Sequence, residues 1–410
     1  MQRSNGSVAV IASNMVQFYA IKNGIDALQR EGIDVELIVP EKREYIQKVT
    51  DEAYEEIVSK GYSPQRNLNE SKKYKILLEP NPGKMYYGRD KVEYEYMIKY
   101  KYALISAKPS IGFAVDRNIM YDAILCHTKR EAEILSAYTK TFVIPPLKYS
   151  NFRKESDRPC KKPTLLYLPT FGEVSSIDHI EKALKTLSND YHIIVKAHHW
   201  TTGLEKSRIE LLKNNADEYY DQKTDLAELL KRTDVVLSDN SAAVFEAIYS
   251  EVPVAIYNCD TLNKLKLGNI DTYHYQLVKK GVIPYTDDID DIGDILESAI
   301  DNFDKQREEK ADFLNAEDAV DIFVDTIKHF LKSDRGSIEY YAMHDIIKNG
   351  FEEKNKVINC LIKENGDKGK RIDYLEKELT DIVNSRAYKL GRVLTAPYQA
   401  VVRKSGRKTE

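Results

Sequence analysis

The stretch TDVVLSDNSAAVFEAIYSEVPVAIYN, residues 233–258, decides the fold. A short apolar run ends at Leu237, a polar turn follows, and a helical segment begins at Ser241 and leads into a second apolar run, VPVAIYN. Short, continuous apolar runs are typical of strands in a parallel sheet that helices cover on both faces. The stretch therefore predicts a strand–helix–strand unit of an α/β fold.

The same alternation is repeated on both sides of this stretch. The first forty residues read as a strand, a helix and a strand, and residues 121–146 read as two more strands around a helix. A second series begins at residue 163 and continues through YHIIVKAHH at 191–199 to the helix IGDILESAI. Between about residues 41 and 106 the chain is rich in Tyr and Lys and shows no regular pattern. We expect two doubly wound, Rossmann-like domains that face each other across a cleft, which is the GT-B architecture.

Composition shifts along the chain predict its domains. Residues 149–163 lack apolar periodicity and read as a linker. We expect an N-terminal Rossmann-like domain on the acceptor side and a C-terminal one for the nucleotide donor. A charged helical segment with loosely spaced heptads and a basic amphipathic tail follow them. The predicted boundaries are 1–150, 163–330, 331–384 and 385–410.

Overall composition excludes several classes of function. The 410 residues have a net charge of −4, whereas a dedicated nucleic-acid-binding protein is normally basic. The four cysteines include no CxxC pair, which argues against a zinc ribbon or a disulfide scaffold and favours a reducing cytoplasm. No targeting segment or membrane span is evident, and neither GxGxxG nor the P-loop pattern occurs. The chain must therefore bind phosphates in another way.

The turn after Leu237 is the first candidate site. Ligands of open α/β sheets bind at the carboxyl ends of strands, where the N-termini of helices offer free amides to phosphates. We predict that Asp239, Asn240, Ser241 and Ala242 contact a diphosphate and that Glu246 reaches a ribose hydroxyl. The alternative is that Asp239 or Ser241 only caps the helix.

Two further strand ends carry candidate residues. Lys196 and His198 follow the strand at 191–196, where a cation and an imidazole suit phosphoryl chemistry. On an extended chain His198 and His199 point to opposite faces, so at most one of them is expected to be catalytic. Thr170 and Gly172 form a loop after the strand at 164–168 that either contacts phosphate or is a plain turn.

No metal site is predicted. The two histidines at 198 and 199 have no third ligand at a suggestive spacing. The string Asp288-Ile289-Asp290 resembles a metal-binding DxD, but acidic capping of the helix that follows explains it better. We expect no cofactor apart from the nucleotide-linked substrate.

The three stretches LYLPTFGE, VKAHHW and DVVLSDNSAAVFEAIYSEVPVAIY together resemble the signature of the CDP-glycerol glycerophosphotransferases, the family of teichoic-acid-type polymerases and primases. The resemblance covers roughly residues 95–330 and is strongest over 164–258. It implies Thr170 in the loop, His198 as the family histidine with Lys196 beside it, and the trio Asp239, Ser241 and Glu246 at the nucleotide.

The sequence departs from this family at several positions. The family has a second histidine in its first domain, but the first histidine here is His127, at a strand–helix junction. Either another residue replaces the family histidine or the transferred group differs. Asp116 is our candidate replacement and third catalytic residue, with Lys108 and Lys84 as alternatives. Asn240 and Ala242 replace the usual Tyr and the second Ser.

The tail combines charge with apolar residues. Residues 385–410 hold seven basic residues and one acid, which leaves the remaining 384 residues with a net charge of −10. A basic amphipathic segment suits an anionic membrane surface; the alternative is a solvated tail. We expect a cytoplasmic protein on the inner face of the cell membrane, with possible homo-oligomers through residues 351–382.

These observations predict a transferase that moves a phospho-polyol onto a hydroxyl of a cell-wall or capsular polymer. The donor is expected to be CDP-glycerol or a related CDP-polyol, the acceptor a polymer or a lipid-linked molecule, and nucleic acid is not an expected partner. The alternatives are a GT-B glycosyltransferase that uses a UDP- or CMP-linked sugar and a degenerate transferase that acts as an envelope-assembly scaffold.

Overall fold

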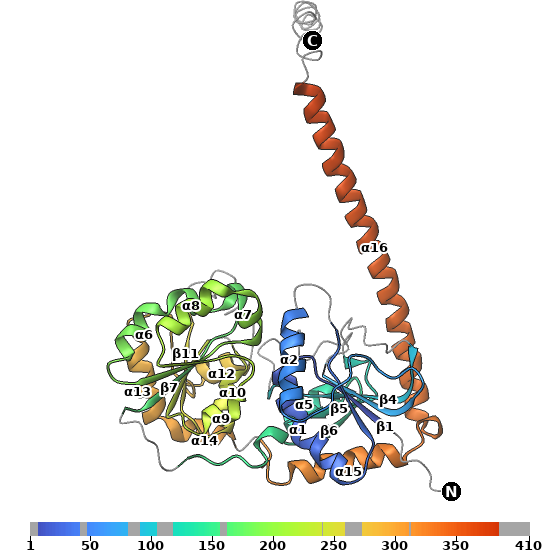
Figure 1. Cartoon of the computed structure of the whole chain (residues 1–410), viewed down its shortest axis with the longest axis horizontal. Helices are drawn as coiled ribbons and strands as arrows, with labels where there is room; N and C mark the ends of the chain where they lie inside the picture. The colour runs from blue at the N-terminus through green and yellow to red at the C-terminus, as the bar shows by residue number, and fades with distance from the viewer. Residues whose placement is uncertain are drawn as a thin grey trace, which may run out of the picture. The chain divides into compact units, whose positions relative to one another are not determined.

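The computed structural model describes residues 7–41, 47–80, 91–104, 118–155, 162–239, 241–258, 273–310 and 313–384 (Figure 1). Contacts divide the chain into two compact units, residues 1–344 and 345–410. Asp116, Lys108, Lys84, Asn240 and the tail from residue 385 lie outside the described residues. The first unit contains two sheets, and we call each sheet with its helices a lobe.

The first lobe is built on a parallel sheet with the strand order β2-β1-β3-β4-β5-β6. Its strands are β1 Ser7–Ile11, β2 Val35–Ile38, β3 Lys73–Glu79, β4 Glu93–Tyr100, β5 Ala123–Cys126 and β6 Lys140–Val143. The helices nearby in sequence are α1 Met15–Arg30, α2 Gln47–Ser59, α5 Lys129–Leu135 and the 3-10 turn η3 Leu147–Tyr149. All five residues of β1 are buried, as its apolar sequence requires.

The second lobe also has a six-stranded parallel sheet, in the order β12-β11-β10-β7-β8-β9. Its strands are β7 Thr164–Leu168, β8 His192–Lys196, β9 Glu218–Tyr220, β10 Val235–Ser238, β11 Val254–Tyr257 and β12 Tyr285–Thr286. Its helices and 3-10 turns are η4 Gly172–Val174, η5 Ile177–His179, α6 Glu181–Leu187, α7 His199–Leu204, α8 Lys206–Asn214, α9 Leu226–Leu230, α10 Ala243–Tyr249, α12 Tyr273–Lys279, α13 Ile292–Asp301 and α14 Phe303–Lys310. Counted from β7, the order is 3-2-1-4-5-6, the arrangement of dinucleotide-binding folds. Two parallel sheets flanked by helices confirm the predicted fold class.

The chain returns to the first lobe after the second. Helix α15, Ala319–Lys332, was assigned to the second domain from sequence, but it packs beside α1 of the first lobe (Figure 1). A Cβ atom placed on Gly24 of α1 would lie 2.6 Å from Cε1 of Phe323, so glycine permits this close approach. Lys328 also pairs with Glu31 at 2.8 Å.

A short turn, η7 Arg335–Ser337, leads to α16, Glu339–Asn384, a helix of 46 residues. Its sequence alternates charged and apolar residues, and this matches the charged helical segment expected after the second domain. Among the helices described here, none has a stretch long and apolar enough to cross a membrane.

Candidate active site

The predicted site loops lie at one edge of the second sheet. Strands β10, β7 and β8 are neighbours and parallel, so the loops after Leu168, Lys196 and Ser238 leave the sheet at the same edge. The strand order reverses between β7 and β10, which is where ligands of such sheets bind.

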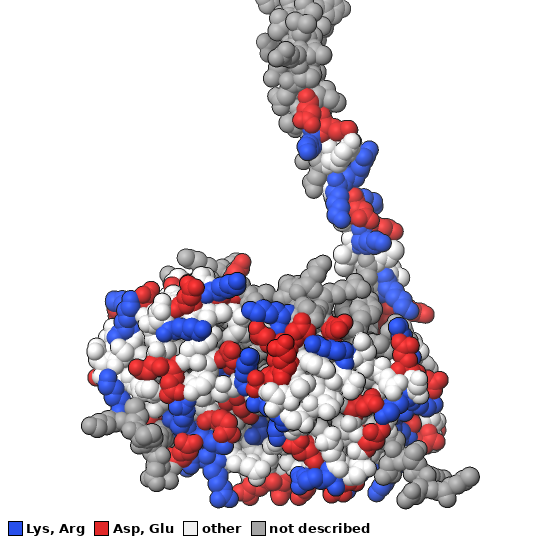
Figure 2. All heavy atoms as spheres, viewed as in Figure 1, with Lys and Arg blue, Asp and Glu red and all other residues white. Residues whose placement is uncertain are grey.

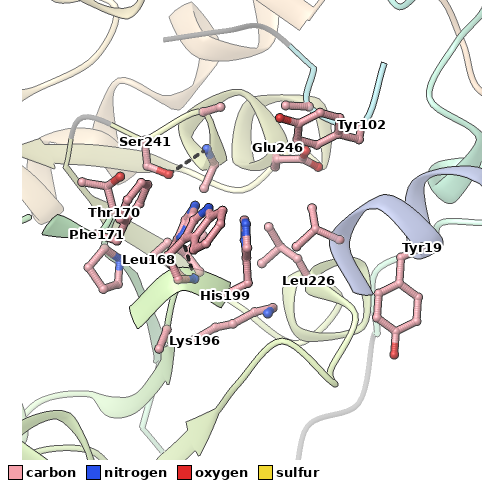
Figure 3. A pocket seen from close by; sticks show the side chains of 18 of the residues that line it. Tyr19, Tyr102, Leu168, Thr170, Phe171, Lys196, His199, Leu226, Ser241 and Glu246 are labelled. Carbon is pink, nitrogen blue, oxygen red and sulfur yellow. Dashed lines mark hydrogen bonds between the residues drawn. The ribbon is translucent and has the colours of Figure 1, made fainter. Parts of the chain in front are cut away.

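A cavity of about 630 Å³ lies at this edge and is lined by residues of both lobes (Figure 3). Tyr19 and Tyr102 line it from the first lobe. The predicted residues that line it are Thr170, Gly172, Lys196, His198, Ser241, Ala242 and Glu246. The structure thus brings predicted residues that are up to 76 positions apart in the sequence, Thr170 and Glu246, around one cavity.

Asp239 does not line this cavity and instead holds the loop that does. Its side chain is fully buried and accepts hydrogen bonds from the backbone N–H of Thr170 at 2.8 Å and from the backbone and hydroxyl of Ser176 at 3.0 and 2.9 Å. Burial raises the pKa of Asp239 to about 6, although these hydrogen bonds oppose the shift. The predicted direct contact between Asp239 and a nucleotide is therefore replaced by a positioning role.

Gly172 occupies a point of the same loop where the backbone is left-handed. Its φ of +71° is in the left-handed region that glycine adopts without cost. Its N–H donates to Glu205 at 3.0 Å, and its carbonyl accepts from Arg208 at 2.9 Å. Arg208 is held in turn by Asp178 at 2.9 Å. These hydrogen bonds hold the loop in place beside the cavity.

His198 ends the extended chain after β8 and caps helix α7. Its Nδ1 accepts a hydrogen bond from the N–H of Trp200 at 3.2 Å. Burial, and then the charge of Lys196, lower the pKa of His198 to about 3, so the ring is neutral at pH 7. With the lone pair of Nδ1 engaged, the proton of the neutral ring resides on Nε2, which makes Nε2 a hydrogen-bond donor.

The prediction that His198 and His199 point to opposite faces is wrong. The strand ends at Lys196, and the chain turns into α7, so the two rings stack 4.1 Å apart at 29°. Phe171 stacks on the other side of His198 at 4.6 Å. Both histidines line the cavity, and the ring of His198 is fixed between two neighbours.

Lys196 lies in the cavity wall and donates a hydrogen bond to the backbone carbonyl of Asp221 at 2.8 Å. Burial lowers the pKa of Lys196 to about 8, even though the carboxylates of Asp225 and Asp221 act in the opposite direction. At pH 7 the ammonium is still mostly charged, in surroundings that disfavour the charge. An anionic ligand would relieve that cost.

Glu246 and Ser241 come from the strand–helix unit that begins with β10. Glu246 is buried and pairs with Lys148 at 2.6 Å, and it also accepts a hydrogen bond from the phenol of Tyr149. Lys148 and Tyr149 belong to η3, so this ion pair joins the segment between the lobes to α10. The hydroxyl of Ser241 accepts from the N–H of Ala243 at 3.3 Å and faces the cavity.

The sequence analysis missed the lysines of the first lobe. Lys99 and Lys101, at the carboxyl end of β4, are buried and line the cavity, as does Lys148. Lys99 donates to Asn118 at 2.8 Å, and Lys101 pairs with Glu131 at 3.1 Å. Their position at the carboxyl end of a strand in the Tyr- and Lys-rich stretch could have identified them as site residues.

His127 does not take the place of the missing family histidine in this cavity. It is buried beside α5, and its Nδ1 lies 3.0 Å from the carbonyl of Ile144. Burial lowers the pKa of His127. Asp116 and its alternatives lie outside the described residues, so the acceptor-side group stays a prediction.

The DxD string serves the turn that precedes α13. The carboxylate of Asp288 accepts from the N–H of Asp290 at 2.9 Å, and Asp290 pairs with Lys182 at 2.5 Å. The N-cap residue of α13 is Asp291, and its side chain makes no capping hydrogen bond, so the two DxD carboxylates hold the preceding turn and do not cap the helix as expected.

Residues 146–313 match the family described as CDP-glycerol:poly(glycerophosphate) glycerophosphotransferase. The matched segment contains the second lobe together with Lys148 and Tyr149 and is similar to that family. No curated protein sequence matches the chain.

Solved structures confirm the GT-B fold of the chain. The wall teichoic acid polymerase TagF, in a variant soaked with CDPG, is 13% identical with a TM-score of 0.54, over 80% of this chain and 90% of that one. UDP-GlcNAc 2-epimerase from Neisseria meningitidis bound to UDP-GlcNAc is 12% identical with a TM-score of 0.53, over 80% of this chain and 100% of that one.

Proposed function

We propose that the chain transfers a phospho-polyol, glycerol phosphate from CDP-glycerol, onto a hydroxyl of a cell-wall or capsular polymer. The observation that carries the proposal is the cavity, lined in part by the matched segment, where a cluster of lysines converges from both lobes (Lys99, Lys101, Lys148 and Lys196). Lys101 and Lys148 are paired with carboxylates, whereas Lys196 donates to an uncharged carbonyl and keeps its charge for a ligand. A diphosphate-linked donor carries the negative charge that such a cluster suits. Transfer of a phosphoryl group depends mainly on positioning and on compensation of charge.

In the proposed step, the acceptor oxygen attacks the phosphorus that carries glycerol. A new P–O bond forms, the P–O bond to CMP breaks, and CMP leaves with the bridging oxygen. The acceptor hydroxyl loses its proton to a base on the first-lobe side, for which Asp116 is the predicted residue. Overall, a phosphodiester and CMP replace a hydroxyl and CDP-glycerol.

His198 and Lys196 stabilise the phosphates in this step. Because Nδ1 of His198 accepts from Trp200, Nε2–H is the group that can donate to a phosphoryl oxygen. Lys196 supplies a positive charge from a neighbouring position in the cavity wall. His198 is thus proposed as a hydrogen-bond donor and not as the base, and Ser241 and Glu246 are proposed to bind the phosphate and the ribose.

The first test is turnover of CDP-glycerol, followed as release of CMP, with a polymer acceptor present. His198→Ala should lower kcat by about 10²–10³-fold, the usual effect of losing one donor to a developing charge. His199→Ala is the matched control and should lower kcat less, while both variants keep the thermal midpoint.

Other donors decide between this proposal and its rivals. Turnover of a UDP- or CMP-linked sugar without turnover of CDP-glycerol would make the chain a glycosyltransferase. Binding of nucleotide without any turnover would support the alternative that the chain is a degenerate transferase that acts as an assembly scaffold. Equal loss of kcat in His198→Ala and His199→Ala would contradict the role given to His198.

We also propose that the tail, residues 385–410, holds the enzyme on the inner, anionic face of the cell membrane, near a polymer or lipid-linked acceptor. Its seven basic residues and one acid support this. Removal of the tail should abolish cosedimentation with vesicles that contain anionic lipid and leave nucleotide binding intact. Binding of the full chain should weaken as salt rises. Equal vesicle binding by both proteins would refute the proposal.

A further inference from the structure

Helix α16 exposes a group of large apolar side chains. Val357, Ile358, Leu361 and Ile362 are 59%, 42%, 52% and 63% exposed, and Leu375 is 46% exposed. Single exposed apolar residues are ordinary on protein surfaces, but a contiguous group marks an interaction surface. The helix therefore presents a face suited to a partner.

The spacing of these residues defines the kind of partner. Ile358, Leu361 and Leu375 fall in a heptad repeat, which Val357 and Ile362 flank. One core position is taken by Ile358, Asn365, Ile372 and Leu379 and the other by Leu361, Lys368, Leu375 and Ile382. A repeat of seven residues keeps one stripe facing a second helix when the two helices supercoil. The sequence of α16 thus favours another helix with the same repeat.

Few features stabilise this helix by itself in water; among them are a hydrogen bond from Tyr374 to Glu378 at 2.6 Å and the guanidinium of Arg371 at 5.0 Å from the ring of Tyr374. Gly350, Gly366 and Gly369 lie inside it, and each costs about 1 kcal/mol relative to alanine. No described atom lies within 4 Å of a Cβ placed on any of the three. Close packing against another described part of the chain therefore does not explain these glycines. Between described side chains of residues 346–384, no ion pair is formed. Packing against a partner would supply the missing stability.

The charges beside the stripe are self-complementary. Glu364, Arg371 and Glu378 share one flanking heptad position, and Glu376 occupies the opposite flank. In a parallel pair, Arg371 of one copy meets Glu376 of the other; in an antiparallel pair, Arg371 meets Glu364. Figure 2 shows basic and acidic side chains interspersed along the described part of this helix. A second copy of the chain therefore offers charges of the correct sign in either direction.

We infer that α16 joins two copies of this chain through the heptad stripe over residues 351–382. Asn365 and Lys368 in the core lower the stability of the pair and limit the number of helices, since a polar residue at a core position specifies register and oligomeric state. This inference does not depend on the proposed transferase reaction.

The test is the mass of the full-length chain in solution, measured by light scattering during size-exclusion chromatography over a range of concentrations. The wild type should have twice the chain mass of 47.1 kDa. Leu361→Glu places a charge in the stripe and should give a single chain mass. Lys363→Glu, on the outer face two residues away, is the matched control and should keep the doubled mass.

A second pair of variants tests the flanking charges without changing the stripe. Arg371→Glu makes the flanks acidic and should raise the dissociation constant at least fivefold. Lys370→Glu makes the same change of charge at the next residue, on the outer face, and should leave the constant within twofold. A monomeric wild type at all concentrations, or equal effects of Leu361→Glu and Lys363→Glu, would overturn the inference. An unchanged thermal midpoint of the α/β unit shows that each variant is folded.

Discussion

Lys101 and Lys196 lie at equivalent places in the two lobes, but their environments differ. Lys101 directly follows β4 of the first lobe, Lys196 is the last residue of β8 of the second, and both line the same cavity. Burial acts to lower the pKa of both. At Lys101 the carboxylate of Glu131, together with Cys126 and Tyr102, outweighs burial and raises the pKa above its usual value. Lys196 donates to a backbone carbonyl and keeps a pKa of about 8.

This difference indicates that the charge of Lys101 has a structural role, whereas the charge of Lys196 can bind a ligand. The pair of Lys101 and Glu131 is neutral overall and connects β4 with α5. Within the described parts of the chain Lys196 forms no ion pair, and its hydrogen-bond acceptor is an uncharged backbone carbonyl. An incoming diphosphate would therefore gain more from Lys196 than from Lys101. The second lobe is expected to bind the donor, and the first lobe to shape the cavity around the acceptor.

The largest expected effect is on folding, from Lys101→Met. This change leaves the buried carboxylate of Glu131 without its cation and should lower the free energy of unfolding by about 3–5 kcal/mol. Urea denaturation measures it. The double variant Lys101→Met/Glu131→Gln should recover much of the loss, and a single variant as stable as the wild type would contradict the structural role of the pair.

Lys196→Met should produce the opposite pattern. The free energy of unfolding should change little, because the charge is disfavoured by its surroundings, while affinity for CDP-glycerol should fall about 10²-fold, or about 2.7 kcal/mol. Calorimetric titration of the donor and denaturation of the same sample give the two values. Unchanged donor affinity would remove Lys196 from the nucleotide site.

The pH dependence of donor binding sharpens the same comparison. Lys196 loses its proton as the pH rises through about 8, so affinity for the donor should fall roughly tenfold from pH 7 to pH 9. Lys196→Arg stays charged over this range and should show a flatter profile. If the wild type and Lys196→Arg decline in parallel, another group governs the pH dependence.

The smallest effect is expected at Ser241. Its hydroxyl faces the cavity and accepts a hydrogen bond from the N–H of Ala243 at 3.3 Å. Ser241→Ala should weaken donor binding several-fold, about 1 kcal/mol, with kcat nearly unchanged. Ser250→Ala, a buried serine after the same helix, serves as the control. A larger effect on kcat than on affinity would contradict a role in binding.

The fold of the second lobe could be predicted because its strands are continuous apolar runs. TLLYL of β7 and VVLS of β10 are fully buried and have few polar residues to obscure the pattern. In the first lobe, KYKILLE of β3 and EYEYMIKY of β4 were missed. Tyr and Lys side chains have a long apolar part and a polar tip, so they can lie in a buried strand. In the sequence, however, they do not form an apolar run, and the two strands were not recognised. The return of α15 to the first lobe also depended on contacts distant in sequence.

The candidate site was predictable where it lies at strand ends of the second lobe. Thr170, Gly172, Lys196, His198 and Ser241 all line the cavity. Sequence alone could not show that the carboxylate of Asp239 is hydrogen-bonded to the loop after β7, because its three hydrogen bonds go to residues more than 60 positions away. The first-lobe lysines were missed together with the strand that carries them.

The position of Trp200 has a spectroscopic consequence. It is the single tryptophan among 410 residues, it lines the cavity, and its ring lies 5.4 Å from that of His199 and 6.1 Å from that of Phe171. Fluorescence excited at the indole band therefore comes from one place in the molecule. Any change in its intensity or wavelength on addition of a nucleotide reports on the cavity itself, without a label and without interference from emission elsewhere in the chain.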